Sequence, residues 1–363
     1  ISVTETTEYD EALTYSRREY LSFDKSRIQA CRVEGVTRQA ALFTFQYQPI
    51  DATIHYFDTD TNAWVSEPLA PGAYRASLVA IEFSSGASLF SYLPKTYNQK
   101  ENGVLEHLPD LDGYLLVTRT EAGWQLKLVS CELQEGQVCD GFVMSAAWPL
   151  LDWSENQNCA TVWNAYTANG VAKWCFDGYY RFTPSNYVPT GENYYYRCVA
   201  SYLIRLMAEQ IGSCDAAPSL SICMLDVLVQ EQNAYGFWPT QPESEWLSGD
   251  FQIADGFYDT RFNTDLIEIF VRVNNDLGGG LYLDTVKRYA AFYQALAEAN
   301  HAETENGGWL VADYWHPQLH DLTHTSLNHL AAECLAAYHL ADLLRDESLR
   351  ETADKLLLAI EDT

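Results

Sequence analysis

A structural unit occurs twice in the C-terminal half of this chain, and its repetition limits the folds that the chain can adopt. Each copy has a glycine-led aromatic loop, then a polar segment, then a run of helical period. The first copy includes residues 236–239 and 258–265, and the second includes residues 307–310 and 324–329. The tryptophans of the two loops are 71 residues apart. Such repetition is typical of stacked supersecondary units, and a ring of them would gather the polar segments around one mouth.

Apolar residues at helical spacing predict six helices between about Tyr194 and the C-terminus. Their stripes begin at Tyr195, Leu220, Ile267, Val286, Leu327 and Leu349. The glycine-rich segment 278–280 separates the third helix from the fourth. Because long aromatic loops divide the helices into three hairpins, an incomplete α/α toroid is favoured over a four-helix bundle. We expect this domain over residues 193–363.

The N-terminal part of the chain has a different period. After a polar start, in which residues 9–13 are expected to open a helix, several runs alternate with period two. These runs are residues 42–47, 52–57, 74–81, 114–119 and 124–129. Alternation with turn signals between the runs predicts an antiparallel β-sandwich over residues 1–148, and residues 149–192 are interpreted as an aromatic-rich connector. The predicted fold class is therefore a multidomain α+β protein.

The charge balance narrows the range of partners. Fifty acidic residues against 22 basic ones give the 363-residue chain a formal charge of −28. Such a surface repels phosphate backbones and anionic membranes, so no nucleic-acid partner is expected. No run of residues approaches the ~20 apolar residues of a membrane span, so no membrane insertion is expected either. A polyanionic glycan would need arginine or lysine gathered locally at its site.

The chain begins at Ile1 and contains nine cysteines. The absence of an initiator methionine favours an extracellular or cell-envelope protein that has been processed, with a cytoplasmic location as the alternative. Cys131 and Cys139 have a hairpin-like spacing that a disulfide would suit, whereas Cys334 is interpreted as a buried apolar side chain.

The first polar segment contains Tyr258, Asp259, Thr260 and Arg261 just before a predicted helix. Asp259 or Thr260 is suited to cap that helix, and Arg261 to pair with a nearby aspartate. The functional alternative makes Tyr258 an acid or base, with Asp259 beside it. Arg261 would then hold a substrate carboxylate.

The second polar segment is rich in histidine, with His316, His320, His324 and His329. Pro317 interrupts any continuous helical face, and no zinc-binding pattern accompanies the histidines, so neither a metal nor a cofactor is expected. We interpret His324 as a catalytic acid or base and His320 as a substrate ligand. Capping and packing are the alternative roles for at least two of the four.

Aromatic and acidic residues near the repeats give further candidates. Trp238, Trp309 and Tyr314 lie in loops and either stack on sugar rings or fill the centre of a helical ring. Asn328, in the second copy, is assigned to substrate binding with them. A glycosidase acid pair is the alternative chemistry, and its candidates are Glu243, Glu245, Asp250 and Asp255.

The order of the parts resembles that of the D-glucuronyl C5-epimerase family, in which a β-rich domain precedes a C-terminal α/α barrel. Two short motifs carry the resemblance: Tyr-Asp-x-Arg at residues 258–261 and His-x-x-Thr-His at residues 320–324. Leu319 stands where that family has a tyrosine before the second motif. The resemblance covers about the last third of the chain, and it implies a carbohydrate-active α/α toroid that moves the proton on C5 of a uronate.

These observations converge on a saccharide ligand, which is a uronate in the most specific form of the hypothesis. An enzyme would carry out epimerisation or lyase-type elimination, with Tyr258 and His324 as acid and base and Arg261 neutralising the carboxylate. Glycoside hydrolysis near Asp255 is the competing chemistry. A non-catalytic glycan-binding surface protein and a purely structural partner are the alternatives from other functional classes.

Overall fold

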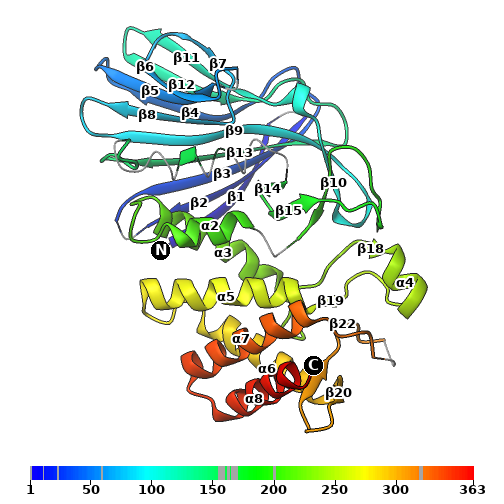
Figure 1. The fold of residues 1–363 in the computed structure, drawn as a ribbon. Coiled ribbons are helices and arrows are strands. Elements are labelled where there is room, and N and C mark those ends of the chain that lie inside the picture. Colours follow the sequence, from blue (N-terminus) through cyan, green and yellow to red (C-terminus); the bar gives the residue numbers. More distant parts are fainter. Residues whose placement is uncertain are drawn as a thin grey trace. The chain divides into compact units, whose positions relative to one another are not determined.

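The structure is a computed structural model. It describes residues 2–10, 12–22, 24–58, 60–153, 160–161, 164, 171–198, 202–318 and 322–363. The chain forms two compact units: unit 1 is residues 1–182, 191–195 and 209–223, and unit 2 is residues 183–190, 196–208 and 224–363. Strands dominate unit 1 and helices dominate unit 2 (Figure 1), which confirms the α+β prediction.

Unit 1 contains two antiparallel sheets. In the described residues the larger sheet has twelve strands, and nine follow the order β1 (Ser2–Asp10), β2 (Leu13–Leu21), β3 (Arg27–Gly35), β13 (Gln137–Ala146), β9 (Ser88–Gln99), β10 (Leu105–His107), β17 (Tyr194–Arg197), β15 (Gly178–Phe182) and β14 (Ala172–Cys175). From β9 the sheet also continues through β8 (Leu78–Phe83), β5 (Ala52–Asp58) and β6 (Ala63–Pro68). Two single 3₁₀ turns, η1 (Glu101–Gly103) and η2 (Pro109–Leu111), flank β10.

The smaller sheet has the order β4 (Ala41–Tyr47), β12 (Gly123–Val129), β11 (Tyr114–Thr120) and β7 (Gly72–Tyr74). Alternate residues of both sheets are buried in one apolar core, including Val33, Ile81, Leu89, Val143, Leu42, Leu115, Leu126 and Leu128. Side chains at every second position of a strand point to the same face, so period-two alternation places this set on the inner faces. The predicted β-sandwich is consistent with this arrangement.

One helix prediction is wrong, and another helix begins later than predicted. Residues 9, 10, 12 and 13 lie in a hairpin, because β1 and β2 pair in register from Ser2↔Leu21 to Asp10↔Leu13. Residues 194–197 form β17, in which Tyr195 pairs with Leu105 of β10, and the first helix that the sequence predicted begins at Tyr202 as α2 (Tyr202–Glu209). Aromatic residues favour strands, and pairing with a neighbouring strand outweighs a weak helical period.

The disulfide suggested for Cys131 and Cys139 is absent, and both thiols are free. Cys131 Sγ donates to the backbone oxygen of Asp112 at 3.2 Å. Cys139 is buried in the apolar core of the sandwich. The two cysteines therefore have separate structural roles.

Unit 2 is built on α5 (Thr260–Leu277), α6 (Leu283–Ala299), α7 (Leu327–Leu344) and α8 (Glu347–Asp362). These are the last four helices predicted from the sequence. Shorter α2 (Tyr202–Glu209) and α4 (Glu245–Phe251) precede them, and α3 (Ala217–Glu231) crosses the boundary between the two units. Helix α7 packs against both α5 and α8, and α7 and α8 form the C-terminal hairpin (Figure 1). In the described part of the chain, no helix is long and apolar enough to cross a bilayer.

Short ladders join the loops of unit 2. They pair β16 (Tyr187–Val188) with β18 (Glu243–Ser244), β19 (Tyr258–Asp259) with β22 (Tyr314–Trp315), and β20 (His301–Glu303) with β21 (Trp309–Val311). The β19–β22 pair lies immediately before α5 and on the segment that leads to α7. Both polar segments found in the sequence are thus attached to one ladder.

Candidate functional site

The β19–β22 ladder brings the two polar segments together. Tyr258 pairs with Trp315, and Asp259 pairs with Tyr314. The backbone N–H of Thr260 also donates to the carbonyl oxygen of Asp313 at 3.0 Å. The starts of α5 and α7 are therefore held side by side, as the repeat in the sequence led us to expect.

Asp313 is the buried carboxylate at the centre of this junction, and it is only 1% exposed. Its Oδ1 accepts a hydrogen bond from the backbone N–H of Ser326 at 2.9 Å, and its Oδ2 accepts one from the Ser326 hydroxyl at 2.5 Å. His324 Nε2 lies 3.3 Å from the same Oδ2. Asp313 therefore fixes the segment before α7 and holds the imidazole of His324 through one ring nitrogen.

His324 combines this support with access to solvent, because its side chain is 41% exposed. Three aromatic rings surround it: the centroids of Trp246, Phe251 and Tyr314 lie 5.3, 5.8 and 5.8 Å from the imidazole centroid. We call these three residues the aromatic shelf. Trp246 is itself 40% exposed, so a ligand that reaches His324 also meets an apolar ring face.

A second histidine lies on the inner side of Asp313. His329 Nδ1 is 2.6 Å from the Thr260 hydroxyl and 3.8 Å from Asp313 Oδ2. Burial lowers the pKa of His329, although the charge of Asp313 opposes the shift. His329 is therefore suited to a structural role as a neutral ring, whereas His324 faces solvent.

Asp259 caps α5, as one of the sequence interpretations proposed. Its side chain accepts from the backbone N–H of Phe262 at 2.9 Å. The carboxyl is 3% exposed, and burial raises its pKa to about 7, against the lowering effect of the backbone N–H groups. The neighbouring charge of Asp313 adds to the increase. Burial therefore favours the protonated form of the Asp259 carboxyl.

Tyr258 is fully buried, and its hydroxyl forms a 2.9 Å hydrogen bond with the hydroxyl of Tyr289. Burial raises its pKa well above the usual value. A buried hydroxyl that already has a partner cannot reach a ligand at the aromatic shelf in this conformation. Tyr314 is the tyrosine that contacts His324, and burial raises its pKa as well.

Arg261 points along α5 rather than into open solvent. Its Nε donates to Asp265 Oδ1 at 3.0 Å, and its Nη1 donates to the backbone oxygen of Asn328 at 3.3 Å. The Arg261 side chain is still 37% exposed, and Asn328 is exposed. Both residues lie beside the start of α7, close in sequence to His324 and His329.

The two repeat tryptophans are separated from this cluster. Trp238 is fully buried, donates through Nε1 to the backbone oxygen of Leu228 at 2.7 Å, and stacks on Phe270. Trp309 lies on the β20–β21 hairpin, where it stacks on His301 with a centroid distance of 4.3 Å. Neither ring belongs to the aromatic shelf, and Trp238 fills the helical core.

The remaining candidates are placed as follows. His320 lies outside the described residues. The four acidic residues considered for hydrolysis are all exposed: Glu243, Glu245, Asp250 and Asp255. The buried carboxylates of unit 2 are other residues, among them Asp259, Asp313 and Glu333. In the described residues, no cluster of three or more His, Cys, Asp or Glu side chains is arranged to hold a metal ion.

Sequence reasoning missed Asp313, Trp246 and Glu333. Asp313 stands 13 residues before Ser326, and no spacing rule connects the two. Trp246 lies in the first turn of α4, whose N-cap is Ser244. A serine at this position could have predicted the short helix that carries the exposed ring of Trp246. Glu333 lies on an apolar helical face, where a charged residue is unusual enough to mark a special environment.

No protein-family model matches the chain, and no curated protein matches it. One similar solved structure is a family 76 glycoside hydrolase from a bovine Bacteroides thetaiotaomicron strain, with 12% identity and a TM-score of 0.35. The match covers 90% of this chain, which spans 59% of that structure.

Proposed function

We propose that unit 2 binds a saccharide at the aromatic shelf and that His324, oriented by Asp313, exchanges a proton with it. One observation carries the proposal: an exposed imidazole is held by a buried carboxylate and surrounded by aromatic rings. A base that is oriented by a third group is the usual arrangement in acid–base catalysis. The neighbouring rings offer the apolar surface on which the C–H face of a sugar can stack.

In the specific form of this proposal, His324 removes a proton from the carbon next to a uronate carboxylate, giving epimerisation or elimination. Tyr314 takes the acid role that the sequence assigned to Tyr258. Its hydroxyl keeps a proton at neutral pH because burial raises its pKa, and its ring contacts that of His324. Arg261, which remains partly exposed beside the start of α7, neutralises the carboxylate of the substrate.

The domain assignment belongs to the same proposal. The sequence divides the chain into a sandwich over residues 1–148, a connector over 149–192 and a toroid over 193–363. Strands β14, β15 and β17 of the second and third ranges extend the large sheet, so we propose that α5 to α8 form an incomplete α/α toroid whose mouth holds the aromatic shelf. The packing of α7 against α5 and α8 supports the toroid. An extracellular or cell-envelope location, where polysaccharides are met, fits this function.

Glycoside hydrolysis is the second candidate, and the pKa of about 7 at Asp259 favours it. A carboxylic acid whose pKa is raised toward neutral pH can act as a general acid, with a second acidic side chain as its complement. Asp313 is the neighbouring acidic side chain here. Both side chains are almost fully buried and already hold backbone N–H groups, so this chemistry requires an opening of the site that proton transfer by His324 does not.

The experiment is incubation in D2O with a panel of uronate-containing and neutral polysaccharides, read by NMR. Deuterium at C5 without cleavage supports epimerisation, new unsaturated ends support elimination, and new reducing ends support hydrolysis. His324→Gln should abolish the first two activities while saccharide binding persists, and His316→Gln is the matched control. Binding without any reaction across the panel would indicate a glycan-binding protein, and no binding at all would refute the proposal.

A further inference from the structure

The first strand of the large sheet, β1, is an edge strand. In the described residues it stands at the end of the strand order, and it pairs with β2. All nine of its residues are exposed, so no part of the described chain packs against its outer edge. In an edge strand the backbone N–H and C=O groups of alternate residues point away from the sheet, and they can pair with a further strand.

Strand β1 lacks most of the features that keep other chains away from a sheet edge, which are short length, bulges, prolines and outward charges. It is nine residues long, contains neither proline nor lysine, and pairs with β2 in unbroken register. Two of its acidic residues already have partners on β2. Glu5 Oε1 lies 2.6 Å from Arg18 Nε, and Glu8 Oε2 lies 3.3 Å from Arg17 Nε. Most of the negative charge of this edge is therefore balanced within the hairpin.

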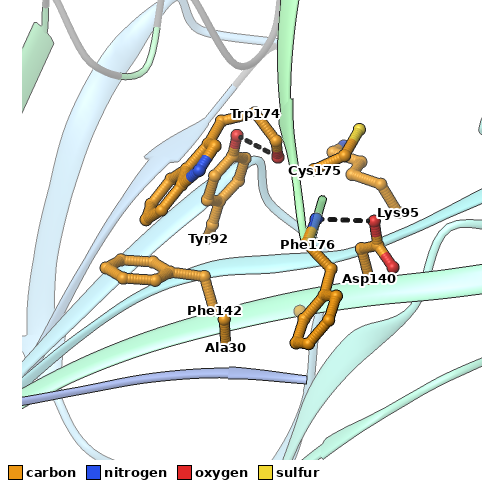
Figure 2. Close-up of a pocket in the computed structure, with 9 residues that line it drawn as sticks. Ala30, Tyr92, Lys95, Asp140, Phe142, Trp174, Cys175 and Phe176 are labelled. Atoms are coloured by element: carbon orange, nitrogen blue, oxygen red, sulfur yellow. Dashed lines mark hydrogen bonds between the residues drawn. The ribbon is translucent and has the colours of Figure 1, made fainter. Parts of the chain in front are cut away.

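Arg18 also fixes the hairpin to the body of unit 1. It is buried, its Nη1 donates to the backbone oxygen of Phe176 at 3.2 Å, and its guanidinium carbon lies 5.0 Å from the centroid of the Phe176 ring. Phe176 is held in turn by its backbone N–H, which donates to Asp140 Oδ2 at 2.9 Å (Figure 2). The edge strand is therefore ordered before any partner arrives, which lowers the entropic cost of pairing.

The sequence of β1 is complementary to itself in one antiparallel register. When two copies pair about Thr6, the whole strand overlaps, and Val3 of each copy lies opposite Tyr9 of the other. Val3 and Tyr9 are 42% and 81% exposed, and an aromatic ring opposite a β-branched side chain is a favourable cross-strand pair. Thr6 lies opposite Thr6 of the second copy, which is also favourable, and no acidic residue lies directly opposite another.

The neighbouring registers of the same symmetry are poorer. Pairing about Glu5 places the two Glu5 side chains directly opposite each other, and like charges in that position destabilise a strand pair. Pairing about Thr7 shortens the overlap to residues 4–10 and leaves Val3 outside it. The register about Thr6 is therefore the one that the sequence favours.

We propose that β1 is the interface of a two-fold symmetric dimer, in which the β1 strands of two copies of this chain pair antiparallel about Thr6. The pairing joins the large sheets of the two copies into one sheet. A single pair of strands is a small interface, so the dimer forms reversibly and depends on the protein concentration. All residues of this interface belong to unit 1, so the proposal does not depend on the His324 site.

Sedimentation velocity of the full chain over a range of concentrations measures the self-association, and we expect a shift from monomer to dimer. Thr6→Glu is the test variant. Thr6 pairs with Arg17 of β2, so a glutamate suits the monomer, whereas the dimer would place two glutamates directly opposite each other. Self-association should weaken roughly fivefold or more, and Thr6→Val, which keeps a β-branched side chain, should dimerise like the wild type. A wild type that stays monomeric, or a dimer that Thr6→Glu leaves unchanged, would overturn the proposal.

Thr6→Cys tests the register. Directly opposite Cα atoms of an antiparallel pair are about 4.5–5.5 Å apart, which a disulfide can span, so mild oxidation should link two Thr6→Cys chains. In the same register the two Cα atoms of position 4 are separated by roughly 14 Å along the strands, so Thr4→Cys should not be linked. Wild type treated in the same way controls for the native cysteines. A Thr6→Cys protein that dimerises without forming the disulfide, or a Thr4→Cys protein that links equally fast, would contradict the register.

Discussion

Glu333 makes the stability of unit 2 depend on pH in a direction that can be predicted. Its side chain is fully buried on α7, where Oε2 accepts a hydrogen bond from the Tyr293 hydroxyl at 3.0 Å. In the described structure Oε1 has no hydrogen-bond partner. Burial raises the pKa of this carboxyl from 4.5 to about 8, and the Tyr293 hydroxyl opposes the increase only in part.

The direction in which stability changes with pH follows from the number of protons bound by the folded and unfolded chains. Between about pH 4.5 and pH 8 the folded chain keeps a proton that the unfolded chain releases, so unfolding becomes easier as the pH rises. The stability that the neutral carboxyl contributes is fully present below pH 4.5 and is lost progressively up to about pH 8. At neutral pH this difference disfavours the folded state by about 3 kcal/mol, as an order of magnitude.

Glu333→Gln removes this titration while keeping the size of the side chain and an acceptor for Tyr293. We expect similar free energies of unfolding for wild type and variant at about pH 5, and a variant that is more stable by about 4 kcal/mol at about pH 8. Urea unfolding at each pH, followed by far-ultraviolet circular dichroism, measures these free energies, because the helices of unit 2 dominate the far-ultraviolet signal. Glu351→Gln, at an exposed position of α8, is the control. Parallel pH profiles for wild type and Glu333→Gln would refute the reasoning.

Three further substitutions test other parts of the structure. Trp246→Ala removes an exposed ring of the aromatic shelf and should weaken saccharide binding roughly tenfold in calorimetry, with unchanged stability. Gly308→Ala places a Cβ 2.4 Å from the backbone nitrogen of Ala359, so the melting temperature should drop by an amount equivalent to about 1–3 kcal/mol. Asp140→Asn removes the bidentate carboxylate of the buried Arg32 guanidinium, which keeps the Asp177 carboxylate at 2.8 Å, so it should cost about 1.5–3 kcal/mol in urea unfolding; a loss below about 0.5 kcal/mol would contradict that account.

Periodicity was sufficient to predict most of the regular elements. The stripes that begin at Ile267, Val286, Leu327 and Leu349 lie on α5 to α8, because an amphipathic helix shows its buried face in its own sequence. The alternating runs of unit 1 became strands for the same local reason. The helix predicted from Tyr195 begins only after residues 194–197, because these residues pair as a strand with β10. That strand lies about ninety residues earlier in the chain, so a local pattern does not reveal the pairing.

The sequence identified some residues of the candidate site and missed others. His324 and Asp259 stood out because both precede a helix whose start is visible in the sequence. Asp313 did not, since its role depends on contacts with Ser326 and His324 that only the folded loop creates. Tyr258 looked reactive as part of a motif, but the fold buries its hydroxyl against Tyr289.

The most direct test of the proposed proton transfer compares wild type with His324→Gln in D2O, on the saccharide of the panel that binds best. NMR reports deuterium at C5 or unsaturated ends, and calorimetry on the same samples reports binding. We predict that His324→Gln loses the exchange or elimination and keeps most of the affinity. Turnover at the wild-type rate in the His324→Gln protein would contradict the role assigned to His324.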